Sequence, residues 1–581
     1  MQRASRIGFC TLLAASWLAT AARAGAVNVT TRNFDNNRSG WNNAETKLTA
    51  GNLGTLHHSR SFLVDEKVEA QPLVFGKALF VFTMNNSVYR FDVNTGAQIG
   101  FRTLGVAINP QSQPGQMDDK GTYKKWGIAS TPVIDPDTNT LYVVAFQQAP
   151  GAAGPQANQN REYHLYTLDA TTLQNQQPDI LIAGNADNGG AHFNTGTQTP
   201  YQKLRAGLGL LKDQAGKKAV IVMFSQNGED PHGAGRGFVF AYDTRGLRHQ
   251  AGFTTKPAIW CVTPHGGAGG IWMAGSAPAI SGDQIYFTTG NGSINNDNFS
   301  ESFVKLTYAP GNAATNGGKP SLTVADFWTA FDDDQRVFND QDLGSAGVLL
   351  VPGFQSLIGG GKDGVLYNLN RNNLGQHSWT PHFNLPFVAT YLPNPPNVAA
   401  GLPATTNADP HSPIVDLDRN LPGGVPDGKT HHIHGTPVFL RMGNHGNVYV
   451  WGENERVKVY NYDFATQRID AFRNQGTVFA SAGVPHMGGM PGGMLALSSN
   501  GNQNGSAVLW TTIPKNGDAN QGEHTRGSFI AYDATTIVGN QELKQLFAFD
   551  FNFYSKFSPP VIANGKVYVP TFDNSVLEFA L

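Results

Sequence analysis

Two neighbouring segments carry side chains that suit a planar ligand and a metal ion. Trp272 ends the run Gly269-Gly270-Ile271-Trp272, and Asn291 lies within Thr289-Gly290-Asn291-Gly292-Ser293. An indole face stacks on planar conjugated rings, and an amide oxygen is a ligand that hard cations accept. Each residue also has a structural interpretation, in which Trp272 fills core space and Asn291 forms a turn.

Three histidines, His431, His432 and His434, are a second candidate for chemistry. In an extended segment His432 and His434 project to the same face, where two imidazoles can bind a transition metal. The alternative is a structural or ring-lining role, because His434-Gly435-Thr436-Pro437-Val438 has the same pattern as another strand start, Ser130-Thr131-Pro132-Val133. Both interpretations stay open at this point.

Composition limits the class of protein that can position these residues. Of the 581 residues, 40% are hydrophobic, 14% are charged and 67 are glycine, and the formal net charge is −2. High apolar content with little charge excludes a disordered chain and a coiled coil. The lack of a basic excess argues against nucleic-acid binding. Abundant glycine favours many tight turns between short strands.

Residues 1–24 have the pattern of a secretory signal peptide. Arg3 and Arg6 precede a short apolar run, and Ala22-Arg23-Ala24 fits the small-x-small rule for cleavage. The run is too short to cross about 30 Å of hydrocarbon, and no later stretch is long enough to do so. We therefore expect a periplasmic or extracellular protein without a membrane span. Its mature part keeps one cysteine, Cys261, so no intrachain disulfide can form.

A strand-and-turn unit recurs along the whole mature chain. The unit reads approximately Val/Leu-x-Tyr/Leu-Asp/Asn-x-x-Thr-Gly, in which alternating β-branched and aromatic residues predict half-buried strands and Gly-containing pairs predict turns. Most copies follow a strand introduced by proline, which is tolerated where no ladder donor is yet needed. The copies are Tyr89–Gly96, Leu165–Ala170, Val239–Asp243, Phe303–Leu306, Leu366–Asn370, Val457–Tyr460, Phe529–Asp533 and Val576–Leu581.

These repeats predict an all-β, eight-bladed β-propeller that occupies residues 25–581 as one domain. Each unit has about 70 residues, and four strands of five or six residues use about a third of them, so loops make up the rest. Closing the units into a ring leaves only short, protected edges. The C-terminal strand Val576–Leu581 is therefore expected to share a blade with an N-terminal strand. Two stacked β-sandwich domains are the alternative.

The blade signatures resemble the pyrroloquinoline quinone (PQQ)-dependent, or quinoprotein, alcohol dehydrogenase superfamily over nearly the whole mature chain. In those enzymes a Gly-Gly-x-x-Trp-like segment places an indole under the flat quinone, and a Thr-Gly-Asn-x-Ser segment supplies an amide oxygen to Ca²⁺. The resemblance implies that Trp272 supports the quinone and that Asn291 binds the metal. It also implies that Lys362, in Gly359–Gly364, contacts the quinone. The alternative for Lys362 is a hairpin lysine beside an Asp-Gly turn.

The resemblance further assigns three carboxylates. Phe338–Gly344 falls where the enzymes carry a Trp-Asp-Tyr-Asp or Trp-Asp-Tyr-Ala segment, which would make Asp340 the general base and a metal ligand. Asp342 would lie where lanthanide-dependent relatives add a carboxylate. Glu229 best matches the metal-binding Glu of their Gly-Ala-Glu segment, with Asp230 as a rival. The alternatives are a capped turn for the two aspartates and a solvated loop acid for Glu229.

The chain also departs from that pattern. With one mature cysteine it lacks the two adjacent cysteines that cover the quinone in many of these enzymes, and the Trp-Asp-Tyr pattern is reduced to Asn339-Asp340-Gln341. No Cys-x-x-Cys-His haem attachment motif is present, so electrons would have to leave to a separate acceptor.

The resemblance implies oxidation of an alcohol or sugar hydroxyl by hydride transfer to PQQ bound together with Ca²⁺ or a lanthanide. The metal would polarise the carbonyl that accepts hydride, and Asp340 would take the hydroxyl proton. Because Ca²⁺ wants six to eight oxygens, the few side chains require the quinone to complete the site. The alternative is a non-catalytic propeller that binds a glycan, a peptide or an envelope partner through its long loops. The missing cysteines favour this alternative, and the order of the Trp272, Asn291 and Asp340 segments favours the enzyme.

Overall fold

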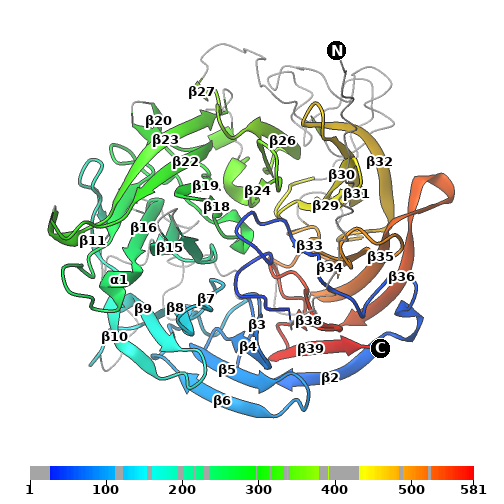
Figure 1. The fold of residues 1–581 in the computed structure, drawn as a ribbon, viewed down its shortest axis with the longest axis horizontal. Coiled ribbons are helices and arrows are strands. Elements are labelled where there is room, and N and C mark those ends of the chain that lie inside the picture. Colours follow the sequence, from blue (N-terminus) through cyan, green and yellow to red (C-terminus); the bar gives the residue numbers. More distant parts are fainter. Residues whose placement is uncertain are drawn as a thin grey trace, which may run out of the picture.

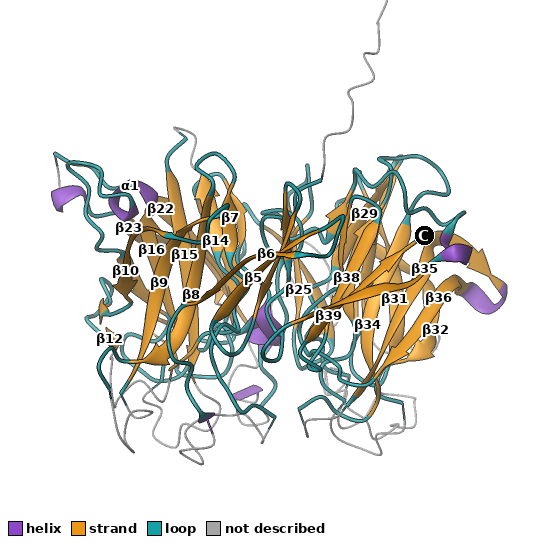
Figure 2. Ribbon diagram, turned by 90° about the horizontal axis from the view of Figure 1, so that it is seen from below, coloured by secondary structure: helices purple, strands orange, loops and turns teal. Residues whose placement is uncertain are grey.

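Short antiparallel β-sheets arranged in a ring make up the described part of the chain (Figure 1). The computed structural model describes residues 27–110, 122–152, 160–193, 202–212, 216–226, 235–295, 297–314, 316–330, 336–337, 340–377, 390–391, 431–482, 489–520 and 525–581. Seen from the side, the strands run between the two faces of the ring (Figure 2). The predicted all-β propeller is confirmed. The signal peptide and the domain boundaries stay predictions, because residues 1–26 lie outside this description.

Each blade is built around four antiparallel strands, most of which follow one another in the chain, and short strands such as β27 (Gln376–His377) add to some of the sheets. The first blades are β3 (Leu73–Phe75), β4 (Ala78–Phe82), β5 (Ser87–Asp92) and β6 (Gln98–Thr103), then β7 (Val133–Asp135), β8 (Thr140–Gln148), β9 (Arg161–Asp169) and β10 (Asn175–Leu181). The next are β14 (Gly209–Lys212), β15 (Lys218–Gln226), β16 (Phe238–Asp243) and β17 (Ala258–Cys261), then β18 (Ala279–Ser281), β19 (Gln284–Thr288), β22 (Ser302–Ala309) and β23 (Ser321–Thr329). One short helix, α1 (Thr244–Leu247), follows β16.

The second half of the ring repeats this plan. Its blades are β24 (Leu349–Leu350), β25 (Ser356–Gly360), β26 (Val365–Asn370) and β28 (Thr390–Tyr391), then β29 (Val438–Met442), β30 (His445–Val450), β31 (Arg456–Asp463) and β32 (Arg468–Phe479). These are followed by β33 (Met494–Ser498), β34 (Val508–Asn516), β35 (Arg526–Val538) and β36 (Glu542–Phe551), and by β37 (Val561–Ala563), β38 (Lys566–Pro570) and β39 (Ser575–Ala580) with β2 (His57–Leu63). These eight units follow the strand pairings of the described residues. The predicted number of eight blades stays a prediction, because β32 also pairs with β36 and joins two of the units into one nine-stranded sheet.

The last blade closes the ring by joining the two ends of the chain. C-terminal strand β39 pairs antiparallel with N-terminal strand β2, in a register that runs from His57 opposite Ala580 to Leu63 opposite Ser575. The predicted sharing of a blade between the two ends is therefore confirmed. This pairing covers the edge that β39 would otherwise expose.

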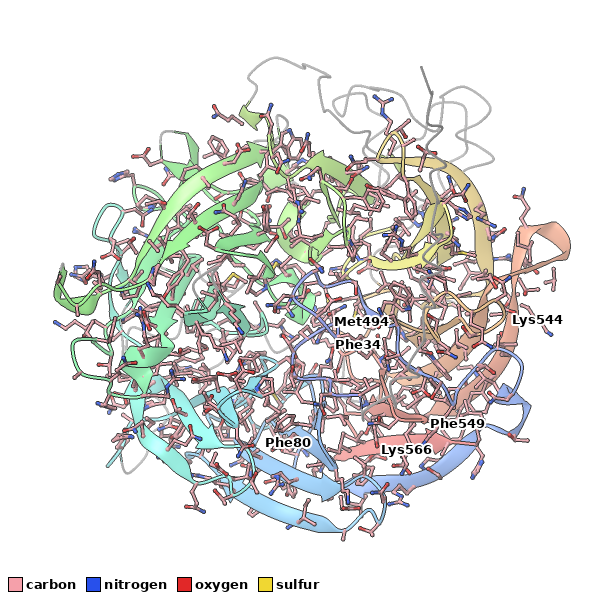
Figure 3. All side chains as sticks on the ribbon, in the orientation of Figure 1. Phe34, Phe80, Met494, Lys544, Phe549 and Lys566 are labelled. Carbon is pink, nitrogen blue, oxygen red and sulfur yellow. The ribbon has the colours of Figure 1, made fainter. Side chains whose placement is uncertain are left out.

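Apolar side chains fill the spaces between neighbouring blades. Val239 and Trp260 of one blade pack with Phe287 and Val304 of the next in a single buried cluster. Residues near the axis of the ring include Phe34 and Met494, whereas exposed Lys544 lies at the outer edge (Figure 3). Burial of both faces of each sheet explains why the inner strands are nearly continuous apolar runs.

A segment before the first blade holds the ring from the inside. Residues Val29–Asn42, here called the N-terminal strap, hydrogen-bond to the innermost strand of each of the eight units (Figure 1). The partners, in chain order along the strap, are Val74, Ile134, Leu210, Ile280, Leu350, Phe439, Leu497 and Ile562. The sequence analysis does not predict this strap, because it contains no copy of the blade repeat.

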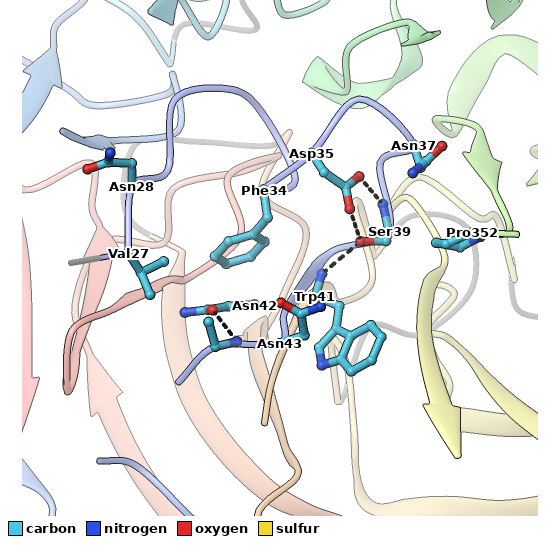
Figure 4. Close-up of a pocket in the computed structure, with 11 residues that line it drawn as sticks. Val27, Asn28, Phe34, Asp35, Asn37, Ser39, Trp41, Asn42, Asn43 and Pro352 are labelled. Carbon is cyan, nitrogen blue, oxygen red and sulfur yellow. Dashed lines mark hydrogen bonds between the residues drawn. The ribbon is translucent and has the colours of Figure 1, made fainter. Parts of the chain in front are cut away.

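The strap also lines a hollow of about 440 Å³ (Figure 4). Asp35 accepts hydrogen bonds from the backbone N–H of Ser39 at 3.1 Å and from its hydroxyl at 2.5 Å, so the polar groups of the strap satisfy one another. The hollow also includes Pro352, which lies in the turn from β24 to β25. It therefore belongs to the face of the ring that carries the turns between first and second strands.

The opposite face carries the loops that enter each innermost strand and the loops that join second to third strands. Because all blades have the same strand order, these loops gather at one end of the axis. Within the described residues no helix has the length and apolar character needed to cross a membrane.

Candidate functional site

The described candidate residues come from the loops of two neighbouring blades and meet near the axis. Trp272 precedes β18 and Asn291 follows β19, whereas Asp342 precedes β24 and Lys362 lies between β25 and β26. Trp272 packs against a small cluster that includes Met494 and Phe557, from blades much later in the chain. Contact with these distant blades places the indole beside the axis rather than on the outer rim.

A recurring backbone hydrogen bond sets the relative position of the two loops in each of these blades. The N–H of Gly290 donates to the carbonyl oxygen of Gly270 at 2.9 Å, and that of Lys362 donates to Asp342 at 3.0 Å. The next blade has the same bond at 3.0 Å, from Glu453 to His432. In each of these three blades, the hydrogen bond joins one residue of the loop before the innermost strand to one residue of the loop between the second and third strands. The two residues therefore lie at equivalent positions along the axis, and their side chains differ from blade to blade.

Lys362 binds both predicted aspartates. Its Nζ lies 2.7 Å from Oδ2 of Asp342 and 2.9 Å from Oδ2 of Asp340. The side chains of Lys362 and Asp342 are 10% and 9% exposed, whereas that of Asp340 is 76% exposed. Asp342 is therefore a buried counter-ion of the lysine, and Asp340 presents its carboxylate to solvent.

Asn291 joins the same cluster through two hydrogen bonds. Its backbone N–H donates to Oδ1 of Asp342 at 2.8 Å, and its Nδ2 donates to Oδ1 of Asp340 at 2.8 Å. Its Oδ1 is buried and makes no hydrogen bond. A buried acceptor without a donor calls for an explanation, and binding of an ion is one. Together with the two carboxylates, this oxygen forms a donor set that suits Ca²⁺ or a lanthanide.

The indole of Trp272 has ring neighbours on several sides. Its ring centroid lies 5.5 Å from that of His434 and 6.0 Å from that of Phe557. The Lys362 ammonium lies 5.7 Å from the indole centroid, within the range of a cation–π contact. Lys362 thus links the indole of Trp272 to the two carboxylates.

The charges of this cluster shift the pKa values of two of its members. Burial disfavours the charged form of Lys362, but Asp342 and then Asp340 outweigh it and raise the pKa of its ammonium. Partial desolvation and then the charge of Asp342 raise the pKa of Asp340, against the opposing effect of Lys362. Asp340 is therefore a stronger base than an ordinary surface aspartate.

Glu229 and its rival Asp230 lie outside the described residues, so their predicted place beside the metal is still a prediction. The other five candidates, Trp272, Asn291, Asp340, Asp342 and Lys362, come together in one cluster.

Two supporting residues were missed by the sequence analysis. Buried Glu301 accepts the N–H of Leu343 at 2.8 Å and so holds the turn that follows Asp342. Burial and then the charge of Asp342 raise the pKa of Glu301 well above its ordinary value, which favours its neutral form. Gly290 leaves room for Asp342, because a Cβ there would lie 2.3 Å from Oδ1 of that aspartate. The glycine in Thr289-Gly290-Asn291 was the available signal for this close approach.

Comparison with known proteins identifies the architecture. No protein-family model and no curated protein matches the chain. Among solved structures, quinohemoprotein alcohol dehydrogenase from Comamonas testosteroni is 14% identical with a TM-score of 0.52, and the match covers 97% of this chain and 81% of that one. The fold is that of the quinoprotein alcohol dehydrogenases.

Two further structures share the quinoprotein fold. Quinohemoprotein alcohol dehydrogenase ADHIIG from Pseudomonas putida HK5 is 12% identical with a TM-score of 0.54, and the match covers 96% of this chain and 80% of that one. A europium-containing methanol dehydrogenase is 14% identical with a TM-score of 0.52, with 96% and 98% covered. At these identities the likeness concerns the fold, and the roles of individual residues need the geometry of this chain.

Proposed function

We propose that this chain is a quinoprotein dehydrogenase-like oxidoreductase that oxidises an alcohol or sugar hydroxyl with PQQ and Ca²⁺ or a lanthanide. The observation that supports it is the single cluster in which Lys362 joins Asp340 and Asp342 to the indole of Trp272. The unpartnered oxygen of Asn291 adds a metal ligand to that cluster. A periplasmic or extracellular location and a separate electron acceptor belong to the same proposal.

Each side chain has a distinct task in this proposal. Trp272 offers a face for stacking, and Lys362 donates to an oxygen of the planar ligand. Asn291, Asp340 and Asp342 hold the cation, with Glu229 as a further ligand. Bound PQQ supplies a hydride acceptor, and the metal polarises it. Asp340 takes the hydroxyl proton, because its carboxylate is exposed to substrate and has a raised pKa.

Cofactor binding is the first test. The chain is titrated with PQQ in the presence of Ca²⁺ or a lanthanide, and quenching of tryptophan fluorescence reports binding. We expect binding at micromolar quinone that requires the metal, because neither ligand has a complete site without the other. Absence of quenching at these concentrations would remove the dehydrogenase assignment.

Turnover is the second test, with dye reduction measured over a panel of alcohols and sugars. Asp340→Asn is expected to lower turnover by about 10² or more, the usual contribution of a general base. The matched control is Asp297→Asn, because the Asp297 side chain is 77% exposed and Asp340 is 76% exposed. Equal losses in both variants would contradict the assignment of Asp340 as base.

A non-catalytic propeller is the second candidate function. It is favoured by the single mature cysteine, Cys261, which is buried and has its pKa raised to about 11 by burial, so it is inert. Such a protein would bind a glycan, a peptide or an envelope partner. Failure of PQQ binding combined with an unchanged, folded chain would support this candidate.

A further inference from the structure

A second cluster of potential ligands lies next to the proposed quinone site. His432, His434 and Glu453 each offer one ligand atom, and these atoms all lie within 4.8 Å of one another. Nδ1 of His432 lies 3.4 Å from Oε2 of Glu453, and Nδ1 of His434 lies 3.3 Å from Oε1. The two imidazoles therefore face the two oxygens of one carboxylate.

The fold builds this cluster from the same two loops as the neighbouring site. His432 and His434 precede β29, and Glu453 lies between β30 and β31, where its N–H donates to the carbonyl oxygen of His432 at 3.0 Å. Gly452 permits this approach, because a Cβ there would lie 2.9 Å from the carbonyl oxygen of His431. Glu453 is thus the positional equivalent of Lys362 in the preceding blade, with the opposite charge.

The spacing of these atoms matches a metal site. With bonds of about 2.0–2.1 Å to nitrogen or oxygen, two ligands of a tetrahedral Zn²⁺ lie roughly 3.4 Å apart. The distances from Nδ1 of His432 and of His434 to the nearest carboxylate oxygen of Glu453, 3.4 and 3.3 Å, agree with this value. The geometry points to a site for a divalent transition-metal ion, Zn²⁺ above all, held by His432, His434 and Glu453. Two imidazoles and one carboxylate leave a fourth position open for water or another ligand.

The state of His434 distinguishes this site from a simple ion pair. The side chain is fully buried, and neither ring nitrogen makes a hydrogen bond. Buried polar atoms of this kind are rare unless an ion or water satisfies them.

Nearby charges set the expected affinity. Glu453 is 2% exposed, so a bound cation would neutralise a buried carboxylate. Lys362 and Lys556 act against the cation, because both place positive charge near His434. His432 is 17% exposed, which gives the ion a route from solvent. We therefore expect micromolar binding rather than the much tighter binding of a closed structural site.

The test is direct metal binding to the full chain after removal of metals with a chelator. Isothermal titration with ZnCl₂ is expected to give one equivalent that binds with micromolar affinity, and titration with CoCl₂ is expected to give the visible bands of a four-coordinate ion. His434→Gln and Glu453→Gln should each weaken Zn²⁺ binding by at least tenfold, since even outer-shell changes have effects of that size. The matched control is His265→Gln, because His265 is 55% exposed and is not one of the three proposed ligands.

The outcomes separate this site from the proposed quinone site. Asp340→Asn should change Zn²⁺ affinity by much less than the tenfold loss expected for the cluster variants, because Asp340 acts on His432 through its charge and is not one of the ligands. His434→Gln should not abolish the Ca²⁺ requirement of PQQ binding. Unchanged Zn²⁺ affinity in both cluster variants, with a loss in His265→Gln, would show binding by surface histidines only and overturn the proposal. If the variants do not fold, X-ray absorption of the Zn²⁺-loaded wild type decides, because a shell without imidazole nitrogen would also overturn it.

Discussion

Replacing Lys362 with methionine would leave the buried Asp342 carboxylate without its counter-ion. The two side chains are 10% and 9% exposed and lie 2.7 Å apart, so water cannot replace the ammonium. The second bond of Lys362, to Asp340, reaches a side chain that is 76% exposed. The stability effect should therefore come mainly from Asp342.

The magnitude follows from these exposures. Breaking a buried ion pair by removing one partner costs about 3–5 kcal/mol, because a charge is left uncompensated. The exposed pair with Asp340 contributes at most about 1 kcal/mol. With an unfolding entropy of about 2.1 cal/mol/K per residue, a loss of this size lowers the melting temperature of so long a chain by only about 3–4 °C.

A double-mutant cycle followed by calorimetry checks this reasoning. Lys362→Met alone should be the least stable variant, and Lys362→Met combined with Asp342→Asn should recover about 2 kcal/mol, because no buried charge remains. Asp340→Asn should change the melting temperature by less than 1 °C on the same scale. A double variant no more stable than Lys362→Met would refute the assignment of Asp342 as a buried counter-ion.

Three further predictions concern the strap, the site and alkaline pH. Gly40→Ala should destabilise the ring by about 2 kcal/mol or more in calorimetry, because Gly40 has a φ of +68° and a Cβ would lie 2.3 Å from Cγ1 of Val438; Gly54→Ala, with open space, should be neutral. Gly290→Ala should weaken PQQ and metal binding and also lower the melting temperature, because the new Cβ displaces Asp342 from its ion pair with Lys362; unaltered affinity would contradict the proposed donor set. Stability should fall as the pH rises from 10 to about 12. In this range tyrosines with a raised folded-state pKa stay protonated in the folded chain but lose their protons in the unfolded chain. Titration of phenolate absorbance together with melting curves checks this prediction. Burial raises the pKa to about 12 at Tyr89, Tyr166, Tyr286 and Tyr462.

The blade repeat could be predicted from the sequence because the strands of one blade pair with strands that are close in the chain. The predicted strand Val239–Asp243 falls within β16 (Phe238–Asp243), and Phe529–Asp533 falls within β35. Each strand pairs with a neighbour separated by a short turn, so periodicity and turn residues lie within one window of the chain. Ring closure by β39 was also predictable, because an unpaired edge strand needs a partner.

Part of the candidate site could also be predicted from the sequence, because its loops adjoin the repeated strands. Trp272, Asn291, Asp342 and Lys362 lie in loops next to blade strands, so the repeat fixes their level along the axis. Aligning the blades by these loops also makes Glu453 the equivalent of Lys362. The sequence alone does not indicate that Glu453 lies beside His432 and His434, because the acid is far from these histidines in the chain.

Contacts across the axis were decided only by the tertiary structure. The strap residue Asn36 donates to the carbonyl oxygen of Leu210, 174 positions away, at 3.0 Å. Phe557 and His434 reach Trp272 from other blades. Such contacts depend on how the blades are arranged around the ring, and they leave no periodic pattern in the chain. Sequence thus determined the repeating sheets, and only closure of the ring determined which side chains face one another at its centre.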